Sequence, residues 1–430
     1  MIRRLFPQNM VREIVTLQIG NYANNVGVHF WNQLDIEQSH QNTLIDYNTY
    51  FTFNQRTNLP SPRVLIIDYR NAFGNLLDEN EYTHRSERND PSIEVIQRSV
   101  EKNSWSNRLR TRAKFHPKSL LPLVDYWYSP NPEENHFDIY PVGEQVFKKM
   151  FDQTEHSLHY LLESCDCLQS FRCLYDINNS FSGLFTSIQD YLYDECPKQP
   201  MWSFGLGNSS SELNLLSSLV HSMNENQMPT VPCLDSLDTD NLALAIQHSL
   251  ISSDVTLDLL ADRLCPMKKN LLNLVWKIPL ELKHRTLFYY LENSANENVF
   301  PMTNPIGCHY FLRGIQQKQL YDHALYNFNN IETSADLIAT YLREQYSSKM
   351  FISTNSWTEK YDCMSLLTGL INDNNSSFEF FDKLLIKMKK MNYKLLSKRW
   401  EENDFDEQMY EHLMNELSNM HEQYQLDKME

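Results

Sequence analysis

The order of apolar and polar positions in the first seventy residues predicts the start of a parallel α/β sheet. Residues 11–18 alternate and are rich in β-branched side chains, which predicts a strand. A turn of small residues (20–27) leads into Val28-His29-Phe30-Trp31, where a helix is predicted to start. A second strand is predicted at residues 63–69, whose continuous apolar run indicates a parallel strand covered on both faces. Strand, turn and helix in this order form the first unit of a doubly wound sheet.

The middle of the chain predicts alternating helices and strands, with a polar interruption at residues 80–135 that is expected to hold loops and short helices. The last two predicted strands are assigned to a second sheet. The helices are predicted at residues 155–169, 185–194, 240–251 and 257–264, and the strands at residues 171–176, 200–205, 271–278 and 308–313.

The C-terminal sixty residues carry the clearest helical periodicity. Two apolar stripes at helical spacing, with acidic residues elsewhere on the second segment, predict a helical hairpin packed on the body of the protein. A coiled-coil contact with a partner is the alternative. The first stripe is Phe378, Phe381, Leu384, Leu385 and Met388, and the second is Phe405, Met409, Leu413, Leu417 and Tyr424.

These elements divide the chain into four predicted parts. Residues 1–10 form an N-terminal extension whose two arginines lack the apolar core of a secretory signal, with an organelle-targeting peptide as the alternative. Residues 11–235 form a doubly wound, mostly parallel sheet domain of the nucleotide-binding type. A second, mixed α/β domain covers residues 236–371, and the helical hairpin covers residues 372–430.

Composition narrows the function classes. The 430 residues are 41% hydrophobic with a formal charge of −17, which argues against nucleic-acid binding through phosphate neutralisation. No apolar run approaches the length of a membrane span. Glycine is scarce: the chain has 10, about a third of the usual frequency of about 7%. Because nucleotide-binding loops use glycine to bring the backbone close to phosphates, the chain has little material for one.

Cysteine usage indicates reduced thiols. The eight cysteines form no Cys-x-x-Cys pair and lack regular spacing, as expected in a reducing compartment. One cluster has metal-ligating residue types, but it overlaps an amphipathic helix with Leu158, Leu161 and Leu162 on one side. We therefore predict no metal site, with zinc as the alternative. The cluster is His156, His159, Cys165 and Cys167.

Three segments together resemble the tubulin superfamily. Residues 11–27 resemble the tubulin opening, in which a Met-Arg-Glu-Ile strand leads into a Gly-Gln-x-Gly-Asn-Gln-x-Gly loop. Residues 62–68 resemble its Pro-Arg-Ala-x-Leu-Val-Asp segment, and residues 398–425 resemble its last two helices. Within the superfamily, residues 20–33, 163–171 and 181–183 are most similar to the Misato family. The resemblance implies a tubulin-like α/β fold.

The residues matching the tubulin phosphate loop depart from its pattern. Residues 177–183, Ile-Asn-Asn-Ser-Phe-Ser-Gly, stand where tubulins have Gly-Gly-Gly-Thr-Gly-Ser-Gly. Only Ser180, Ser182 and Gly183 remain, and Phe181 is expected to put a ring where phosphate would lie. The two serines are alternatively caps of the following helix.

Other nucleotide-site positions are partly retained. The second carboxylate that helps organise magnesium in tubulins is Arg70 here, and Lys269 falls near the glutamate that activates water there. A lysine with a pKa near about 10.4 is a poor general base at neutral pH. No catalytic residue and no cofactor are predicted, with GTP as the alternative. The degenerate remnant of the nucleotide site consists of Gly20, Asn21, Asp68, Ser180, Ser182, Gly183 and Asn241.

The resemblance implies a non-catalytic cytoplasmic protein that acts in mitochondrial distribution, morphology and mitochondrial DNA inheritance, with peripheral association to the mitochondrial outer membrane. It also implies links to microtubule or spindle organisation, and the partners implied are the cytosolic chaperonin, tubulin or microtubules, and mitochondrial surface proteins. One alternative is a GTP-binding switch or polymer-forming relative. Another is a membrane-surface adaptor using Lys383, Lys387, Lys389, Lys390 and Lys394.

Overall fold

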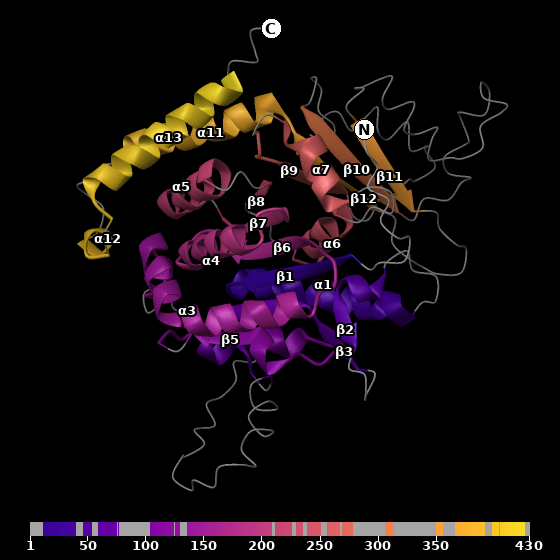
Figure 1. Ribbon diagram of the computed structural model, residues 1–430. Helices are drawn as coiled ribbons and strands as arrows, with labels where there is room; N and C mark the ends of the chain where they lie inside the picture. Colours follow the sequence, from indigo (N-terminus) through magenta and orange to yellow (C-terminus); the bar gives the residue numbers. More distant parts are fainter. Residues whose placement is uncertain are drawn as a thin grey trace, which may run out of the picture.

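In a computed structural model, the chain forms two β-sheets with helices packed around them (Figure 1). The larger sheet and its helices come from the first 250 residues, and the smaller sheet and the C-terminal helices complete the body. The predicted extension at residues 1–10 lies outside the described residues. The structure describes residues 12–39, 46–53, 59–74, 76, 104–123, 125–129, 136–208, 211–225, 229–234, 239–250, 256–266, 269–277, 306–313, 350–355, 366–391, 398–403 and 405–425.

The larger sheet has six parallel strands in the order β5-β4-β1-β6-β7-β8. Leu17 is in register with Leu65 on one side and with Cys173 on the other, which puts the first strand in the middle. The prediction of an internal parallel strand at residues 63–69 is therefore confirmed. The strands are β1 (Glu13–Ile19), β4 (Val64–Tyr69), β5 (Leu120–Leu123), β6 (Leu168–Asp176), β7 (Met201–Gly207) and β8 (Thr230–Leu234), and a separate antiparallel pair is β2 (Phe51–Phe53) and β3 (Pro60–Pro62).

Helices cover both faces of this sheet. The chain moves from β1 to β4 in one direction and from β6 to β8 in the other, so right-handed connections place the intervening helices on opposite faces. α1 packs against α6 on one face, and α3, α4 and α5 pack together on the other. The helices are α1 (Asn21–Ser39), α3 (Tyr140–Glu163), α4 (Phe181–Glu195), α5 (Glu212–Val220), α6 (Thr239–Ser249), α7 (Leu257–Leu264), α11 (Asn374–Lys390), α12 (Lys398–Glu401) and α13 (Glu407–Gln425), and α5 continues into the π-helical turn η6 (His221–Glu225).

The smaller sheet is mixed, in the order β11-β10-β12-β9. Its central strand β10 pairs in parallel with β11 and antiparallel with β12. The two strands predicted for a second sheet are confirmed, whereas the other two had no predicted counterpart. The strands are β9 (Asn273–Lys277), β10 (Gly307–Arg313), β11 (Met350–Asn355) and β12 (Leu366–Asn372). The proposed boundaries at residues 235, 371 and 372 stay a prediction.

Three expectations from the sequence need correction. The polar stretch at residues 80–135 contains β5, a four-residue edge strand in which Pro122 is tolerated because one side of an edge strand needs no ladder donor. The first turn is shorter than expected, because α1 begins at Asn21. The helix predicted at residues 155–169 begins earlier, at Tyr140, and ends at Glu163, so residues 168–169 belong to β6.

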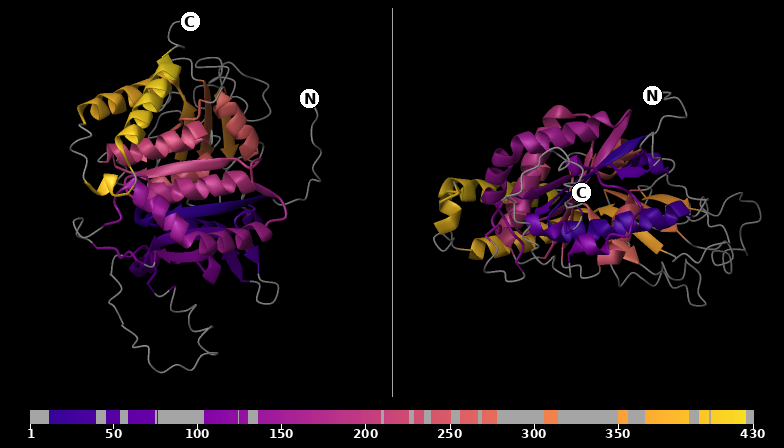
Figure 2. Two further views of the ribbon diagram at one scale, coloured as in Figure 1. Left: turned by 60° about the vertical axis from the view of Figure 1, so that its left-hand side comes forward. Right: turned by 90° about the horizontal axis from the view of Figure 1, so that it is seen from below.

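The C-terminal helices form the predicted hairpin. α11 packs against α13, and both lie across α5 at the top of the molecule (Figures 1 and 2). The hydroxyl of Tyr424 accepts a hydrogen bond from the backbone N–H of Leu271 (3.3 Å), which ties α13 to the residues before β9. Within the part of the chain that the structure describes, no helix is both long and apolar enough to cross a membrane.

Candidate functional site

The carboxyl ends of β1 and β6 define the place where a doubly wound sheet binds ligands. The strand order reverses between these neighbours, and ligands in such sheets bind outside the carboxyl ends at that point. β1 ends at Ile19, and the φ of 112° at the next residue, Gly20, lets the chain turn directly into α1. β6 ends at Asp176, only 5% exposed. The ends of these two neighbouring strands therefore lie next to each other at the carboxyl edge of the sheet.

The carboxylate of Asp176 occupies the N-terminus of α1. The backbone N–H of Ala23 donates to its Oδ1 (2.7 Å), and that of Tyr22 donates to its Oδ2 (3.2 Å). The N–H of Asn21 also contributes to holding the charge. The first N–H groups of a helix have no partner within the helix and carry a partial positive charge, so they attract anions. Here the anion that these N–H groups bind is the carboxylate of Asp176.

Gly20 makes this close approach possible. A Cβ atom on Gly20 would collide with the Cγ, Cβ and Oδ2 atoms of Asp176, so any larger residue would displace the carboxylate. Among the sequence-predicted site residues, Gly20 and Asn21 therefore lie where a phosphate-binding turn would lie. Their contacts are made to Asp176, a residue that was not among the predicted candidates. The sequence signal that could have identified Asp176 is its position, an acid at the carboxyl end of a predicted strand next to the degenerate loop.

Asp68 is the second buried carboxylate at this edge. Its Oδ2 accepts hydrogen bonds from Asn24 Nδ2 and from Trp105 Nε1, both at 2.8 Å, and its Oδ1 accepts from the N–H of Tyr69 (2.7 Å). Its side chain has no exposure to solvent. The acid retained from the predicted nucleotide site is thus fully engaged by groups of the protein.

Burial raises the pKa of both acids. Desolvation raises the pKa of Asp68 to about 7, and the nearby charge of Asp176 adds to that shift. Desolvation also raises the pKa of Asp176 to about 6, although the N–H groups of α1 oppose the shift. At neutral pH the edge of the sheet therefore carries buried negative charge, which repels a phosphate.

The loop after β6 is held by its own polar side chains. The hydroxyl of Ser180 donates to the carbonyl of Ile139 (2.6 Å), and that of Ser182 donates to the carbonyl of Asn179 (2.6 Å). Neither serine side chain caps α4, so the capping alternative is wrong. Ser180 occupies the N-cap position without a side-chain bond to the helix, and the Oδ1 of Asn179, the residue before it, accepts a hydrogen bond from the N–H of Phe181 (3.0 Å). Both serine hydroxyls bond to backbone carbonyls instead of the N–H groups of α4.

Two asparagines fix the same loop to its neighbours. The Oδ1 of Asn178 accepts from the N–H of Asn208 (2.8 Å), which follows β7. The Nδ2 of Asn214 donates to the carbonyls of Asn178 and Asp138, both at 2.7 Å. The loop is therefore bound to the start of α3, to the end of β7 and to α5. Such a loop has few groups left for a phosphate.

The ring of Phe181 lies in the core rather than on the surface of the loop. It is fully buried and makes edge-to-face contacts with Tyr69 and Phe137 at centroid distances of 5.1 and 4.8 Å. An apolar cluster therefore stands beside Asp68 at the carboxyl end of β4. The expectation that this ring lies where a phosphate would bind stays a prediction.

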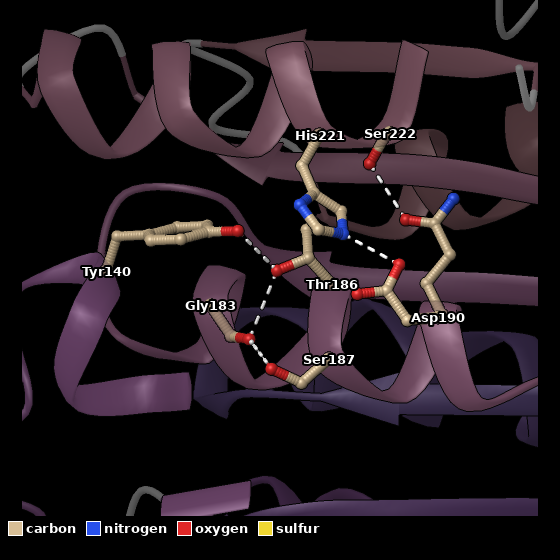
Figure 3. A network of polar contacts seen from close by, with 8 residues as sticks. Tyr140, Gly183, Thr186, Ser187, Asp190, His221 and Ser222 are labelled. Carbon is tan, nitrogen blue, oxygen red and sulfur yellow. Dashed lines mark hydrogen bonds and ion pairs between the residues drawn. The ribbon is translucent and has the colours of Figure 1, made fainter. Parts of the chain in front are cut away.

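Gly183 has a packing role. A Cβ atom there would collide with the backbone carbonyl of Tyr140, and a Cβ on Gly143 would collide with the carbonyl of Ser180. The two glycines let the first turns of α3 and α4 touch backbone to backbone, and Tyr140 also bonds Thr186 through its hydroxyl (2.6 Å) (Figure 3). The retained glycine is thus explained by helix packing.

The remaining sequence-predicted positions lie on other surfaces. Asn241 lies half-buried in the first turn of α6, next to Asp240, which pairs with His29 of α1 (2.9 Å). Arg70 is exposed and stacks its guanidinium over Trp127 at 5.3 Å. Lys269 is buried under the C-terminal hairpin.

The burial of Lys269 changes one interpretation made from the sequence. Its Nζ donates to Asn374 Oδ1 (2.9 Å) and lies 5.3 Å from the centre of the Tyr424 ring. The lysine therefore ties the residues before β9 to α11 and α13. It is not displayed to a neighbouring subunit in the way that the position of the tubulin glutamate suggested.

The residues of the zinc alternative make other contacts. His159 Nε2 pairs with the hydroxyl of Tyr191 (3.0 Å), and His156 Nδ1 with the carbonyl of Asp152 in its own helix (2.5 Å). The described residues contain no group of three or more potential ligands arranged to hold a metal ion. The amphipathic helix predicted around these histidines is the part of α3 that ends at Glu163.

The residues at the sheet edge do not fit the phosphates of GTP. The N–H groups at the N-terminus of α1 bind the carboxylate of Asp176. The side chains of the loop before α4 make hydrogen bonds within the protein. A phosphate in the same place would meet two buried acids. The geometry defines an α/β protein of tubulin-like arrangement, with a six-stranded parallel sheet, a mixed second sheet and C-terminal helices.

Comparison with known proteins agrees with this class. Residues 12–118 match the Misato segment II tubulin-like domain, and residues 98–252 match the tubulin domain. The chain is 24% identical over 291 residues to Protein DML1 of Gibberella zeae, covering 60% of this chain and 57% of that protein. It is 27% identical over 249 residues to Protein misato homolog 1 of Mus musculus, covering 45% and 44%.

A third relative, Protein misato homolog 1 of Danio rerio, is 22% identical over 286 residues, covering 50% of this chain and 48% of that protein. Over these residues the chain is similar to the Misato family and to tubulin-like proteins. It spans about half the length of the curated relatives it matches.

Proposed function

We propose that the chain is a non-catalytic tubulin-like protein that neither hydrolyses GTP nor depends on it. The observation that carries the proposal is the carboxylate of Asp176, which accepts the N–H groups of Tyr22 and Ala23 at the N-terminus of α1. An anion-binding helix terminus that is already filled by an acid of the protein disfavours a phosphate, both by occupying its donors and by charge repulsion.

Titration of the full chain with GTP and magnesium is the direct test. We expect no binding tighter than about 1 µM, a free energy of about −8 kcal/mol. Sedimentation of the same samples is expected to show no GTP-dependent polymer. Submicromolar binding, or filaments that form only with GTP, would contradict the proposal and support the alternative of a GTP-binding switch or polymer-forming tubulin relative.

Asp176→Asn is the matched variant for this titration. It removes the charge and keeps one oxygen acceptor for the N–H groups of α1. If the carboxylate is what excludes phosphate, the variant will bind GTP more tightly than the unmodified chain. Equal, undetectable binding by both would assign the exclusion to the loop before α4 instead. Asp194→Asn, on the exposed end of α4, controls for a general change of charge.

The cellular part of the proposal rests on the Misato and DML1 relatives and on the motif resemblance. The protein acts in mitochondrial distribution, morphology and mitochondrial DNA inheritance, and contributes to microtubule or spindle organisation. It works in the cytoplasm and associates peripherally with the mitochondrial outer membrane. Its partners are the cytosolic chaperonin, tubulin or microtubules, and mitochondrial surface proteins.

A rescue experiment tests this cellular role together with the absence of catalysis. In cells depleted of their own copy, the full chain restores mitochondrial distribution, and Ser182→Ala restores it equally. The reason is that the Ser182 hydroxyl only bonds the carbonyl of Asn179. Normal mitochondria in depleted cells would argue against the cellular role.

A further inference from the structure

A groove at the start of α3 has no part in the proposed function. It has a volume of about 490 Å³ and lies between the first turn of α3, the end of α5 with η6, and the start of α13. Its floor includes Val220, Phe405 and Leu413, each less than a tenth exposed. This volume lies in the usual range of binding pockets, about 300–1,000 Å³.

The charge lining the groove has one sign. Glu144 and Asp406 are its acidic side chains, and among the described residues that line it there is neither lysine nor arginine. The lining also includes the imidazoles of His221 and His412 and the phenol of Tyr140. The whole chain carries −17, so the surrounding field has the same sign. A ligand for this groove is therefore cationic as well as apolar.

Contacts behind the wall hold the groove in shape. His221 Nε2 pairs with Asp190 Oδ1 at 2.7 Å, and the Tyr140 hydroxyl bonds Thr186 at 2.6 Å (Figure 3). The N–H of Met409 donates to Asp406 Oδ1 (2.8 Å), which fixes the acid at the N-terminus of α13. A wall whose side chains are already ordered loses little conformational entropy on binding.

Met409 adds an apolar contact at the rim. Its side chain is 44% exposed, which places it among the few large apolar side chains that the described surface leaves in solvent. Methionine is flexible and polarisable, and it is frequent on surfaces that bind apolar side chains of differing shape. An exposed methionine beside a buried apolar floor is typical of a surface that accepts a side chain from a partner.

We propose that this groove binds a short segment of a partner protein that combines lysine or arginine with a large apolar side chain. The apolar side chain enters between Val220, Phe405 and Leu413, and the cationic groups pair with Glu144 and Asp406. This is the side-chain arrangement of a basic amphipathic helix lying in a groove. The interaction is independent of any nucleotide at the sheet edge.

Selection from a library of random peptides about ten residues long, displayed on phage and bound to the full chain, tests the proposal. We expect the enriched peptides to carry lysine or arginine near leucine, methionine or phenylalanine. On Glu144→Gln with Asp406→Asn, their binding is expected to weaken at least about tenfold, or about 1.4 kcal/mol. Asparagine also caps helices well, so this variant keeps the start of α13. Met409→Ser is expected to weaken the same peptides.

The matched control is Glu163→Gln with Asp262→Asn, which removes the same two charges from exposed positions outside the groove. An equal loss in the control would overturn the proposal, since it would show attraction to the net charge alone. Enrichment of acidic peptides, or no enrichment, would also overturn it. Dimerisation of the chain that the Glu144 and Asp406 variant abolishes would assign the groove to a second copy and would overturn the peptide assignment.

Discussion

Truncation after Ile371 is expected to leave a chain that does not reach a soluble, cooperatively folded state. The deletion removes α11 and α13, whose buried faces pack on α5 and on the residues before β9. The deletion therefore also exposes the surfaces of α5 and of the residues before β9 that these helices cover. The side chains lost from the core include Phe381, Leu384, Leu385, Met388, Leu413, Leu417, Met420 and Tyr424.

The size of the effect follows from burial. Burying one large apolar side chain contributes about 1.5–3 kcal/mol, and a typical protein is stable by about 5–15 kcal/mol in total. Losing even a few of these side chains exceeds that margin. The truncation also removes Asn374 and Tyr424, which contact Lys269 and tie the residues before β9 to the hairpin.

Solubility, size-exclusion elution and thermal unfolding of the truncated chain are the measurements. The control is a stop after Gln425, the last residue of α13, which is expected to unfold at the same temperature as the intact chain. Phe381→Ala gives a graded version and is expected to cost about 3–5 kcal/mol. A truncated protein that is monomeric and as heat-stable as the intact chain would show that the hairpin is a separate interaction module.

The second large effect is a dependence of stability on pH that Asp68 produces. The pKa of Asp68 is about 7 in the folded protein and 3.8 without the environment of the fold. Between these values the folded state holds a proton that the unfolded state has released, so the free energy of unfolding falls as pH rises. A shift of about three units corresponds to about 4 kcal/mol over this window.

The surroundings of Asp68 explain why protonation is favoured. Complete burial of the carboxylate is the main cause, and the nearby charge of Asp176 adds to it, whereas the three hydrogen bonds that its oxygens accept oppose the shift. The Oδ1 atom of Asn24 is also buried without a donor among the described residues. Burial and the charge of Asp176 outweigh the three hydrogen bonds that the carboxylate accepts, so the neutral form is favoured.

Urea unfolding at a series of pH values between 5 and 8 measures this effect. The unmodified chain is expected to lose stability toward pH 8, and Asp68→Asn is expected to lose clearly less because its amide does not titrate. Asp258→Asn, on the exposed side of α7, is the control and is expected to follow the unmodified chain. Identical slopes for the unmodified chain and Asp68→Asn would show that Asp68 does not carry the proton.

The sequence predicted elements whose own pattern was strong. β4 was found because four consecutive apolar residues, 64–67, follow Arg63 without a break. The first half of α3 was missed, because Pro141 and Gly143 argue against a helix when read locally. In the structure the proline occupies the first turn, where its missing N–H costs nothing, and the glycine faces the carbonyl of Ser180.

The candidate site was predicted less completely because its decisive contact joins residues far apart in the chain. Asp176 and Ala23 are 153 positions apart, and nothing in either local pattern pairs them. The role of Ser180 was missed for the same reason, since its hydroxyl binds Ile139, a residue of another element. Of the positions taken from the resemblance, Gly20, Asn21 and Asp68 lie at the carboxyl edge of the sheet, but Asp176, which binds the N-terminus of α1, was not among them.

The carboxylate at the start of α1 has a thermodynamic consequence. A dissociable ligand stabilises a fold in proportion to the logarithm of its free concentration, so the folded fraction follows the supply of that ligand. Asp176 is covalently attached and is present beside Tyr22 and Ala23 at a fixed effective concentration. The contact that it makes is the same in a cell rich in guanine nucleotide and in one that is depleted of it.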